Sequence, residues 1–276
     1  MNYRIVADSC CDLTDEMKAE LGAEDTVPFH INIAGESIVD DDTLSVPVLL
    51  QKMKACTERM TSSCPSPYDF KQAFVNAGKS FAVTISSKLS GSFSSALIGA
   101  QMAREEGAET HVFDSQSAVC GEVLIAYKIR ELLNNGEPRG TVIETITRFI
   151  DDMKTLFVLD DVSNLVKNGR MSKIAGALVS MLGIKPLLGA KDGEIELCGK
   201  VWRDQSVADR LLDAIAECGR VIDGDDLVIA HCNNPTLAEE LLEKAKRRFR
   251  FGKTRIIETR GLSSFYACDK GVVLSF

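Results

Sequence analysis

The chain has 276 residues, of which 45% are hydrophobic and 26% charged, and its formal net charge is −8 at pH 7. This composition is typical of a globular protein with one large or two modest domains. The excess of acidic residues argues against nucleic acid or an anionic membrane surface as the main partner. No apolar run approaches the ~20 residues that a membrane-spanning helix needs.

The first half of the chain alternates strand-like and helix-like segments. Short apolar runs predict buried strands at 4–8, 27–33, 81–85 and 110–114. Helices are expected after the capping residues Thr14, Ser45 and Ser66, over 96–103 and 121–134, and after Thr141, which Glu144 follows at capping-box spacing. This alternation predicts a parallel sheet covered by helices on both faces.

A serine-rich stretch over 86–96 joins one of these strands to the next helix and contains Ser90, Gly91 and Ser92. The free backbone N–H groups at a helix start, surrounded by hydroxyls, attract an anion such as a carboxylate or a phosphate. Taken alone, ordinary helix capping is the more common reason for serines at this place. The stretch therefore predicts either a cap or an anion site.

Other hydroxyls also lie where predicted strands end. They include Ser115 and the run Thr61, Ser62 and Ser63, which precedes the cap at Ser66. Ligands of open α/β sheets bind at the carboxyl ends of the strands, so these hydroxyls are expected to converge. A polar turn remains an equal explanation for the run at Thr61.

The composition changes near residue 151, where we place a domain boundary. A strand at 156–159 and a short helix at 162–167 lead to a turn at 168–172, and an unusually apolar helix follows from Ile174 to Leu182. A helix that is apolar on every side is buried on every side, either in a packed core or beside a narrow tunnel. A hairpin turning at 192–193, helices from Asp204 and Pro235, and strands at 227–231, 255–258 and 272–274 complete the chain.

Cysteine and histidine usage narrows the chemistry. The nine cysteines include no Cys-x-x-Cys pair, which predicts reduced thiols rather than disulfides or a zinc site. The N-terminal segment enters a strand without an apolar signal region, and we therefore expect a cytoplasmic protein.

Six short segments together resemble the DegV family of bacterial fatty-acid-binding proteins, in order and along nearly the whole chain. They are Asp8-Ser9-Cys10-Cys11-Asp12-Leu13, the segment from Thr61 to Pro67, the stretch from Ser86 to Ala96, Asp114-Ser115, Asn168-Gly169-Arg170-Met171-Ser172, and Gly183-Ile184-Lys185-Pro186-Leu187.

This resemblance implies a two-domain α/β fold. A three-layer N-terminal domain with a parallel sheet (1–153) would carry the head-group loops, and a C-terminal α/β domain with a mixed sheet (154–276) would enclose the acyl chain. The implied ligand is a long-chain fatty acid, without a cofactor or metal, in a protein that is not itself an enzyme. Some members resemble the lipid-binding subunit of a fatty acid kinase, which presents the carboxylate to an ATP-binding partner.

The resemblance also implies roles for individual residues. Thr61, Ser90 and Ser92 look like the carboxylate-binding set, and Arg170 matches a basic residue near the head group. Tyr266 stands closest to a histidine that the family usually carries. The remaining site residues are Ser62, Ser63, Gly91 and Ser115 near the head group, and Ile174, Leu178, Met181, Leu182 and Leu187 along the acyl chain.

Two other functions compete with this interpretation. A serine-dependent acyl hydrolase needs a base beside its nucleophile, but the chain has no Gly-x-Ser-x-Gly motif and only three histidines, none of them near a serine motif. A small-anion or phosphosugar-binding protein could use the same hydroxyl-rich helix starts, although the apolar second half argues against it.

Overall fold

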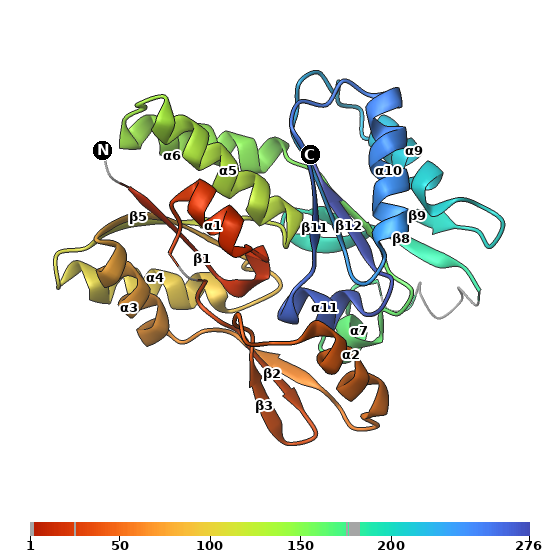
Figure 1. The fold of residues 1–276 in the computed structure, drawn as a ribbon, viewed down its shortest axis with the longest axis horizontal. Coiled ribbons are helices and arrows are strands. Elements are labelled where there is room, and N and C mark those ends of the chain that lie inside the picture. Colours follow the sequence, from red (N-terminus) through yellow and green to blue (C-terminus); the bar gives the residue numbers. More distant parts are fainter. Residues whose placement is uncertain (1–2, 25, 175, 177–182) are drawn as a thin grey trace.

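The computed structural model describes residues 3–24, 26–174, 176 and 183–276. Within these residues the strands form a parallel sheet, an antiparallel sheet and a mixed sheet, with helices packed between and around them (Figure 1). No helix of the described residues has the length and apolar character needed to cross a membrane.

The parallel sheet has the strand order β1-β5-β6. Alternate strand residues face opposite sides of a sheet, and here the two sides belong to different hydrophobic clusters. Helices α3 and α4 cover one side, and α5, with α1 and α6 beside it, covers the other. The elements are β1 (Arg4–Ala7), η1 (Ser9–Cys11), α1 (Asp15–Leu21), α3 (Pro67–Ala77), β5 (Lys79–Thr84), α4 (Ser92–Arg104), β6 (Glu109–Asp114), α5 (Cys120–Asn134) and α6 (Arg139–Asp152).

A small antiparallel sheet, absent from the sequence prediction, has the order β3-β2-β4. It contains β2 (His30–Ile33), β3 (Glu36–Val39) and β4 (Thr61–Ser63), and α2 (Val46–Ala55) lies between β3 and β4 in the chain. The single strand expected at 27–33 was therefore wrong in extent and in its sheet. Pro28 has no N–H to donate to a ladder, which is consistent with strand pairing that starts only at His30.

The second half of the chain forms the mixed sheet, in the order β11-β10-β12-β7-β8-β9. Helices α9 and α10 cover one face, and α5 packs on the other against β10 and β12. The elements are β7 (Thr155–Val158), α7 (Ser163–Lys167), β8 (Lys185–Lys191), β9 (Glu194–Val201), α9 (Val207–Glu217), β10 (Leu227–His231), α10 (Pro235–Arg248), β11 (Thr254–Glu258), α11 (Gly261–Ala267) and β12 (Val272–Ser275).

Helix α5 therefore lies between the parallel and the mixed sheets, and its N-terminal end faces both. The predicted fold class, a parallel three-layer unit followed by an α/β unit with a mixed sheet, is confirmed. The boundary between 1–153 and 154–276 stays a prediction; β7, the first strand of the mixed sheet, begins at Thr155.

The sequence predicted helix starts correctly where a side chain caps the N-terminus of the helix. Thr14 caps α1, and Ser66 and Asp69 form the predicted capping box of α3. Two starts were wrong, because α6 begins after Pro138 rather than at Thr141, and Ser206 rather than Asp204 caps α9. The apolar helix expected from Ile174 to Leu182 falls largely outside the described residues.

Candidate functional site

A cavity lies between the mixed sheet, the start of α5, η1 and α11. It holds about 850 Å³ of unfilled space, part of it open to solvent. Its lining comes from both halves of the chain: Cys10, Phe29, Ser62, Ile85, Leu89, Ser90, Gln116, Ser117, Ala118, Val119, Thr155, Phe157, Leu159, Leu165, Arg170, Ala190, Gly193, Glu194, Ile195, Leu262, Ser263, Tyr266, Ala267 and Val273.

Most of the wall is apolar because of strand alternation. On β7 and just beyond it, Phe157 and Leu159 face the cavity, whereas Leu156 and Val158 belong to the core on the opposite face of the sheet. Val273 of the neighbouring strand β12 faces the cavity in the same way. The run at 155–159 is apolar at nearly every position because both faces of this sheet are covered.

One end of the cavity is polar. The hydroxyls of Ser62, on β4, and Tyr266, on α11, lie 2.8 Å apart, and the guanidinium of Arg170 stacks over the Tyr266 ring with Cζ 5.6 Å from the ring centroid. Burial raises the pKa of Tyr266, while the Ser62 hydrogen bond and the Arg170 charge oppose that shift. The phenol is therefore a neutral donor at physiological pH.

Arg170 is held by two backbone carbonyls. Its Nε donates to the oxygen of Leu89 at 3.1 Å, and its Nη1 donates to the oxygen of Asn168 at 2.7 Å. Within the described residues its Nη2 makes no protein hydrogen bond, so this nitrogen is available to a ligand at the polar end. The contact with Leu89 also ties the second half of the chain to the loop that carries Ser90.

Ser90 lines the cavity and Ser92 does not. Ser92 is fully buried and donates its hydroxyl to Asp8 Oδ2 at 2.5 Å, and its backbone N–H donates to Ser90 Oγ at 3.2 Å. The expectation that Ser92 contacts the ligand stays a prediction, and the structure directs its hydroxyl to Asp8 rather than to the cavity. Its neighbour Gly91 is exposed, precedes α4 and does not line the cavity either.

The run at Thr61 is displaced by one residue from the expectation. Thr61, Ser62 and Ser63 form β4, and neighbouring strand residues point to opposite faces. Ser62 faces the cavity, Thr61 is not among its lining residues, and Ser63 accepts a hydrogen bond from Asn32 on β2. Because these residues form a strand rather than a turn, only the middle one reaches the cavity.

Ser115 supports the cavity from behind. It is buried and donates to the carbonyl of Ser117 at 3.0 Å, while the Ser117 N–H donates back to its hydroxyl. Ser117, not Ser115, lines the cavity.

The expected acyl-chain residues divide into three groups. Ile174 is half-buried and packs against the cluster that includes the cavity wall. Leu187 is fully buried in the core on the opposite face of the mixed sheet, and the expectation that it lines the cavity was wrong, because its neighbour Leu188 faces that side. Leu178, Met181 and Leu182 lie outside the described residues.

Two buried acids stand directly behind the site. Asp8 accepts hydrogen bonds from the N–H groups of Cys10 and Ile85, yet burial raises its pKa from the usual 3.8 to about 6. The carboxyl group of Glu122 is buried beside Asp8 and Cys10, and burial together with the nearby charge of Asp8 raises its pKa well above the usual range. Burial therefore favours the protonated form of Glu122.

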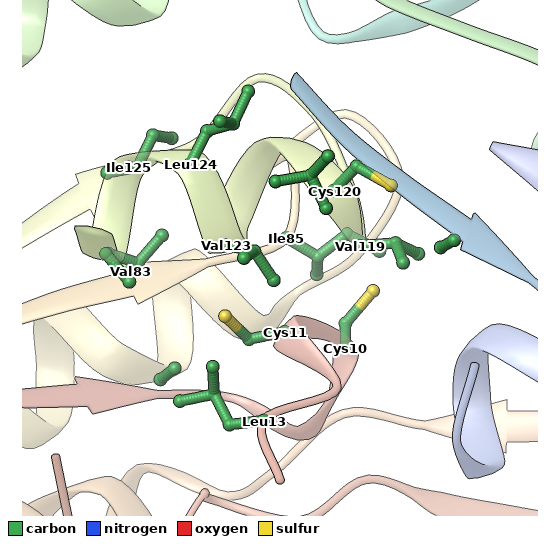
Figure 2. Close-up of a cluster of buried hydrophobic side chains, with 14 of the residues drawn as sticks. Cys10, Cys11, Leu13, Val83, Ile85, Val119, Cys120, Val123, Leu124 and Ile125 are labelled. Carbon is green, nitrogen blue, oxygen red and sulfur yellow. The ribbon is translucent and has the colours of Figure 1, made fainter. Parts of the chain in front are cut away.

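The same environment keeps the Cys10 thiol neutral. Burial and the acids around it raise the pKa of Cys10 well above its usual value. Figure 2 shows Cys10 directed from η1 toward the start of α5, where Val119 and Cys120 lie. A neutral thiol is a weakly polar wall atom and suits an apolar cavity.

Much of the wall was not predicted from the sequence, including Phe157, Leu159, Val273 and Ser263. The alternation of apolar residues in 155–159 could have identified the first two, had the face toward α5 been known. None of the described lining residues is a histidine, and no cluster of potential metal ligands occurs among the described residues.

The fold and the site define an α/β protein with an internal apolar cavity that carries hydroxyls and a guanidinium at one end. A model of the DegV family, described as uncharacterised proteins, matches residues 2–269. The chain belongs to the DegV family.

Relatives of known sequence and structure extend along the whole chain. A DegV domain-containing protein of Streptococcus gordonii is 34% identical over 281 residues, covering 100% of this chain and 99% of the relative. A DegV family protein from Ruminococcus gnavus, refined with vaccenic acid, is 35% identical with a TM-score of 0.94 over 100% of both chains. The fatty acid kinase (Fak) B3 protein of Streptococcus pneumoniae, loaded with linoleic acid, is 33% identical with a TM-score of 0.90, over 100% and 99%.

Proposed function

We propose that this protein binds a long-chain fatty acid, with its carboxylate at Ser62, Tyr266 and Arg170 and its alkyl chain along β7 and β12. The observation that carries the proposal is the polarity of the cavity, which is apolar along the sheet and has hydrogen-bond donors at one end. The vaccenic acid and linoleic acid in similar DegV structures support the same ligand class.

The apolar wall supplies most of the binding free energy. Removing about 14 methylenes from water stabilises the complex by roughly 11 kcal/mol, at ~0.8 kcal/mol each, before the cost of ordering the ligand. Phe157, Leu159 and Val273 provide the surface that this transfer requires.

The polar end can hold a carboxylate without enclosing it in a bidentate ion pair. The Ser62–Tyr266 pair has one hydroxyl proton that its own hydrogen bond does not use, and Arg170 can offer Nη2 while its other contacts hold the side chain in place. Hydrogen bonds to an ionised carboxylate contribute about 1.5–3 kcal/mol each, which orients the ligand. A carboxylate held in this way keeps one oxygen accessible.

We further propose that the protein is not itself an enzyme and presents the carboxylate to a kinase partner. The name of the similar Streptococcus pneumoniae protein supports the kinase connection. Hydrolysis would require a base beside a serine, and the described lining residues include no histidine.

The nine free cysteines support a reducing cytoplasmic location, and a domain boundary after residue 153 fits the start of the mixed sheet.

Mass spectrometry of an organic extract tests the lipid proposal. The purified protein is expected to release a long-chain fatty acid in about equimolar amount, and the delipidated protein is expected to rebind it. The proposal fails if the extract contains no fatty acid and the delipidated protein binds none. Release of a phosphosugar or another small anion would instead support the alternative small-anion function.

The kinase proposal needs its own assay. The fatty-acid-loaded protein, mixed with ATP and the ATP-binding kinase subunit of the same organism, is expected to yield an acyl phosphate. Each component alone should yield none. Lipid binding without acyl phosphate in the complete mixture would refute the kinase role and leave lipid binding intact.

A further inference from the structure

The far end of the cavity contains a row of buried hydroxyls. Thr155 Oγ1 lies 2.6 Å from Ser117 Oγ and 2.8 Å from Ser275 Oγ, and all three residues are at most 6% exposed. Ser117 and Thr155 line the cavity. An otherwise apolar wall therefore ends in a cluster of polar groups.

This cluster lies opposite the head-group end. Thr155 begins β7, and Leu159 follows the end of that strand, about 13 Å away at ~3.3 Å per residue. The polypeptide continues from Leu159 through α7 to Arg170, and α7 contacts α11, which carries Tyr266. Ser275 pairs with Thr155 at the same end of the sheet. The hydroxyl cluster and the guanidinium therefore mark opposite ends of the cavity.

A second, polar cavity begins on the other side of this cluster. The two cavities share Gln116, Ser117, Thr155 and Ala190, so these four residues form the partition between them. The second cavity is lined by charged side chains, among them Asp151, Lys154, Lys191, Glu196 and Glu217. An alkyl chain that passed the partition would meet these charges, mixed with the apolar side chains of Ile150, Met153 and Leu156.

The partition is fixed by its own hydrogen bonds. The Ser117 carbonyl accepts from the Ser86 N–H at 2.8 Å and from the Ser115 hydroxyl. Residues on both sides of Ser117 have positive φ, 49° at Gln116 and 51° at Val119, which are uncommon conformations for residues other than glycine. Such backbone persists only where the surroundings hold it, as they do here.

We propose that the Ser117–Thr155 pair is the end wall that sets the acyl chain length this protein selects. This inference rests on the proposed fatty-acid binding and adds its specificity. A fatty acid whose methyl end reaches Thr155 fills the apolar cavity. A longer one must displace the hydroxyl pair or fold back, and it loses the gain of about 0.8 kcal/mol per buried methylene.

A competition experiment tests the wall. Delipidated protein is incubated with an equimolar mixture of even-numbered saturated fatty acids from myristic to behenic acid, and the bound acids are identified by mass spectrometry. Thr155→Ala removes atoms from the wall and is expected to favour acids two carbons longer by about tenfold relative to wild type. Thr155→Val keeps the size of the side chain and should leave the preferred length unchanged.

Two further variants complete the design. Thr155→Ser keeps the hydroxyl row and removes only a methyl group, so it is expected to fold and to shift the preference in the same direction by less. Thr147→Ala, at an exposed position of α6, is the control without effect. If Thr155→Ala and Thr155→Ser both keep the wild-type preference for acyl chain length, the proposal that Thr155 limits that length is refuted. A wild-type protein that binds no fatty acid would refute the proposed function itself.

Discussion

Replacing Ser92 by alanine separates a structural role from a ligand-binding role. Ser92 donates to the buried carboxylate of Asp8 at 2.5 Å and does not line the cavity. Removing a hydrogen bond to a charged group costs about 1.5–3 kcal/mol. We expect Ser92→Ala to lower the free energy of unfolding by ~2 kcal/mol at neutral pH, while the folded variant retains its fatty acid.

The loss should depend on pH in a direction that Asp8 determines. Its pKa in the folded protein is about 6, above the usual 3.8, so Asp8 stabilises the fold most when it is protonated, and this contribution is lost as pH rises through about 6. The Ser92 hydrogen bond lowers that pKa, so its removal raises the pKa further. The stability difference between Ser92→Ala and wild type should therefore be larger at about pH 8 than at about pH 4.5.

Urea denaturation at the two pH values, followed by circular dichroism, measures this difference. Ser94→Ala is the matched control, because Ser94 is exposed on the same helix and should change stability by less than about 0.5 kcal/mol. Equal losses in the two variants at both pH values would refute the role of the Ser92–Asp8 bond. Loss of lipid from fully folded Ser92→Ala would show that Ser92 acts on the ligand instead.

Three further variants test the polar end and the acid behind it. Tyr266→Phe removes the hydroxyl partner of Ser62 and is expected to weaken fatty-acid binding at least about tenfold, measured by titration of delipidated protein that remains folded. Unaltered affinity would place the carboxylate elsewhere. Arg170→Lys loses the contacts of the planar guanidinium with Leu89 and with the Tyr266 ring, and we expect it to bind the fatty acid at least about tenfold more weakly. Equal affinities of this variant and the wild type in the same titration would contradict that role. Glu122→Gln should match wild type in stability at about pH 5 and exceed it increasingly as pH rises. The reason is that Glu122 ionises freely in the unfolded chain, whereas burial opposes its ionisation in the folded protein, and glutamine does not ionise in either state. Parallel stability curves would show that the pKa of Glu122 is not raised by folding.

The sequence predicted the fold class because its signals are local. The strand at 4–8, the caps at Thr14 and Ser66 and the hairpin turn at Asp192-Gly193 depend on neighbouring residues, and the structure has all of them, with positive φ at both turn residues. The antiparallel sheet was missed because its strands are short and β4 consists of a threonine and two serines. Polar residues of this kind resemble a turn until the pairing with β2 is known.

The site residues stay predictions, but the structure shows which of them lie together. Ser62, Ser90, Arg170 and Tyr266 line the same cavity. Ser92 does not, because its hydroxyl donates to Asp8, which is 84 positions away in the chain. Sequence spacing locates a loop, but strand alternation and distant partners decide which side chain of the loop reaches the ligand.

A crystal structure of the protein loaded with a long-chain fatty acid would show directly how the ligand lies in the cavity. We expect carboxylate oxygens within hydrogen-bond distance of Ser62 and Tyr266, the alkyl chain against Phe157 and Val273, and the methyl end at Thr155. A fatty acid bound in the opposite direction, or at a different place with this cavity unoccupied, would contradict it.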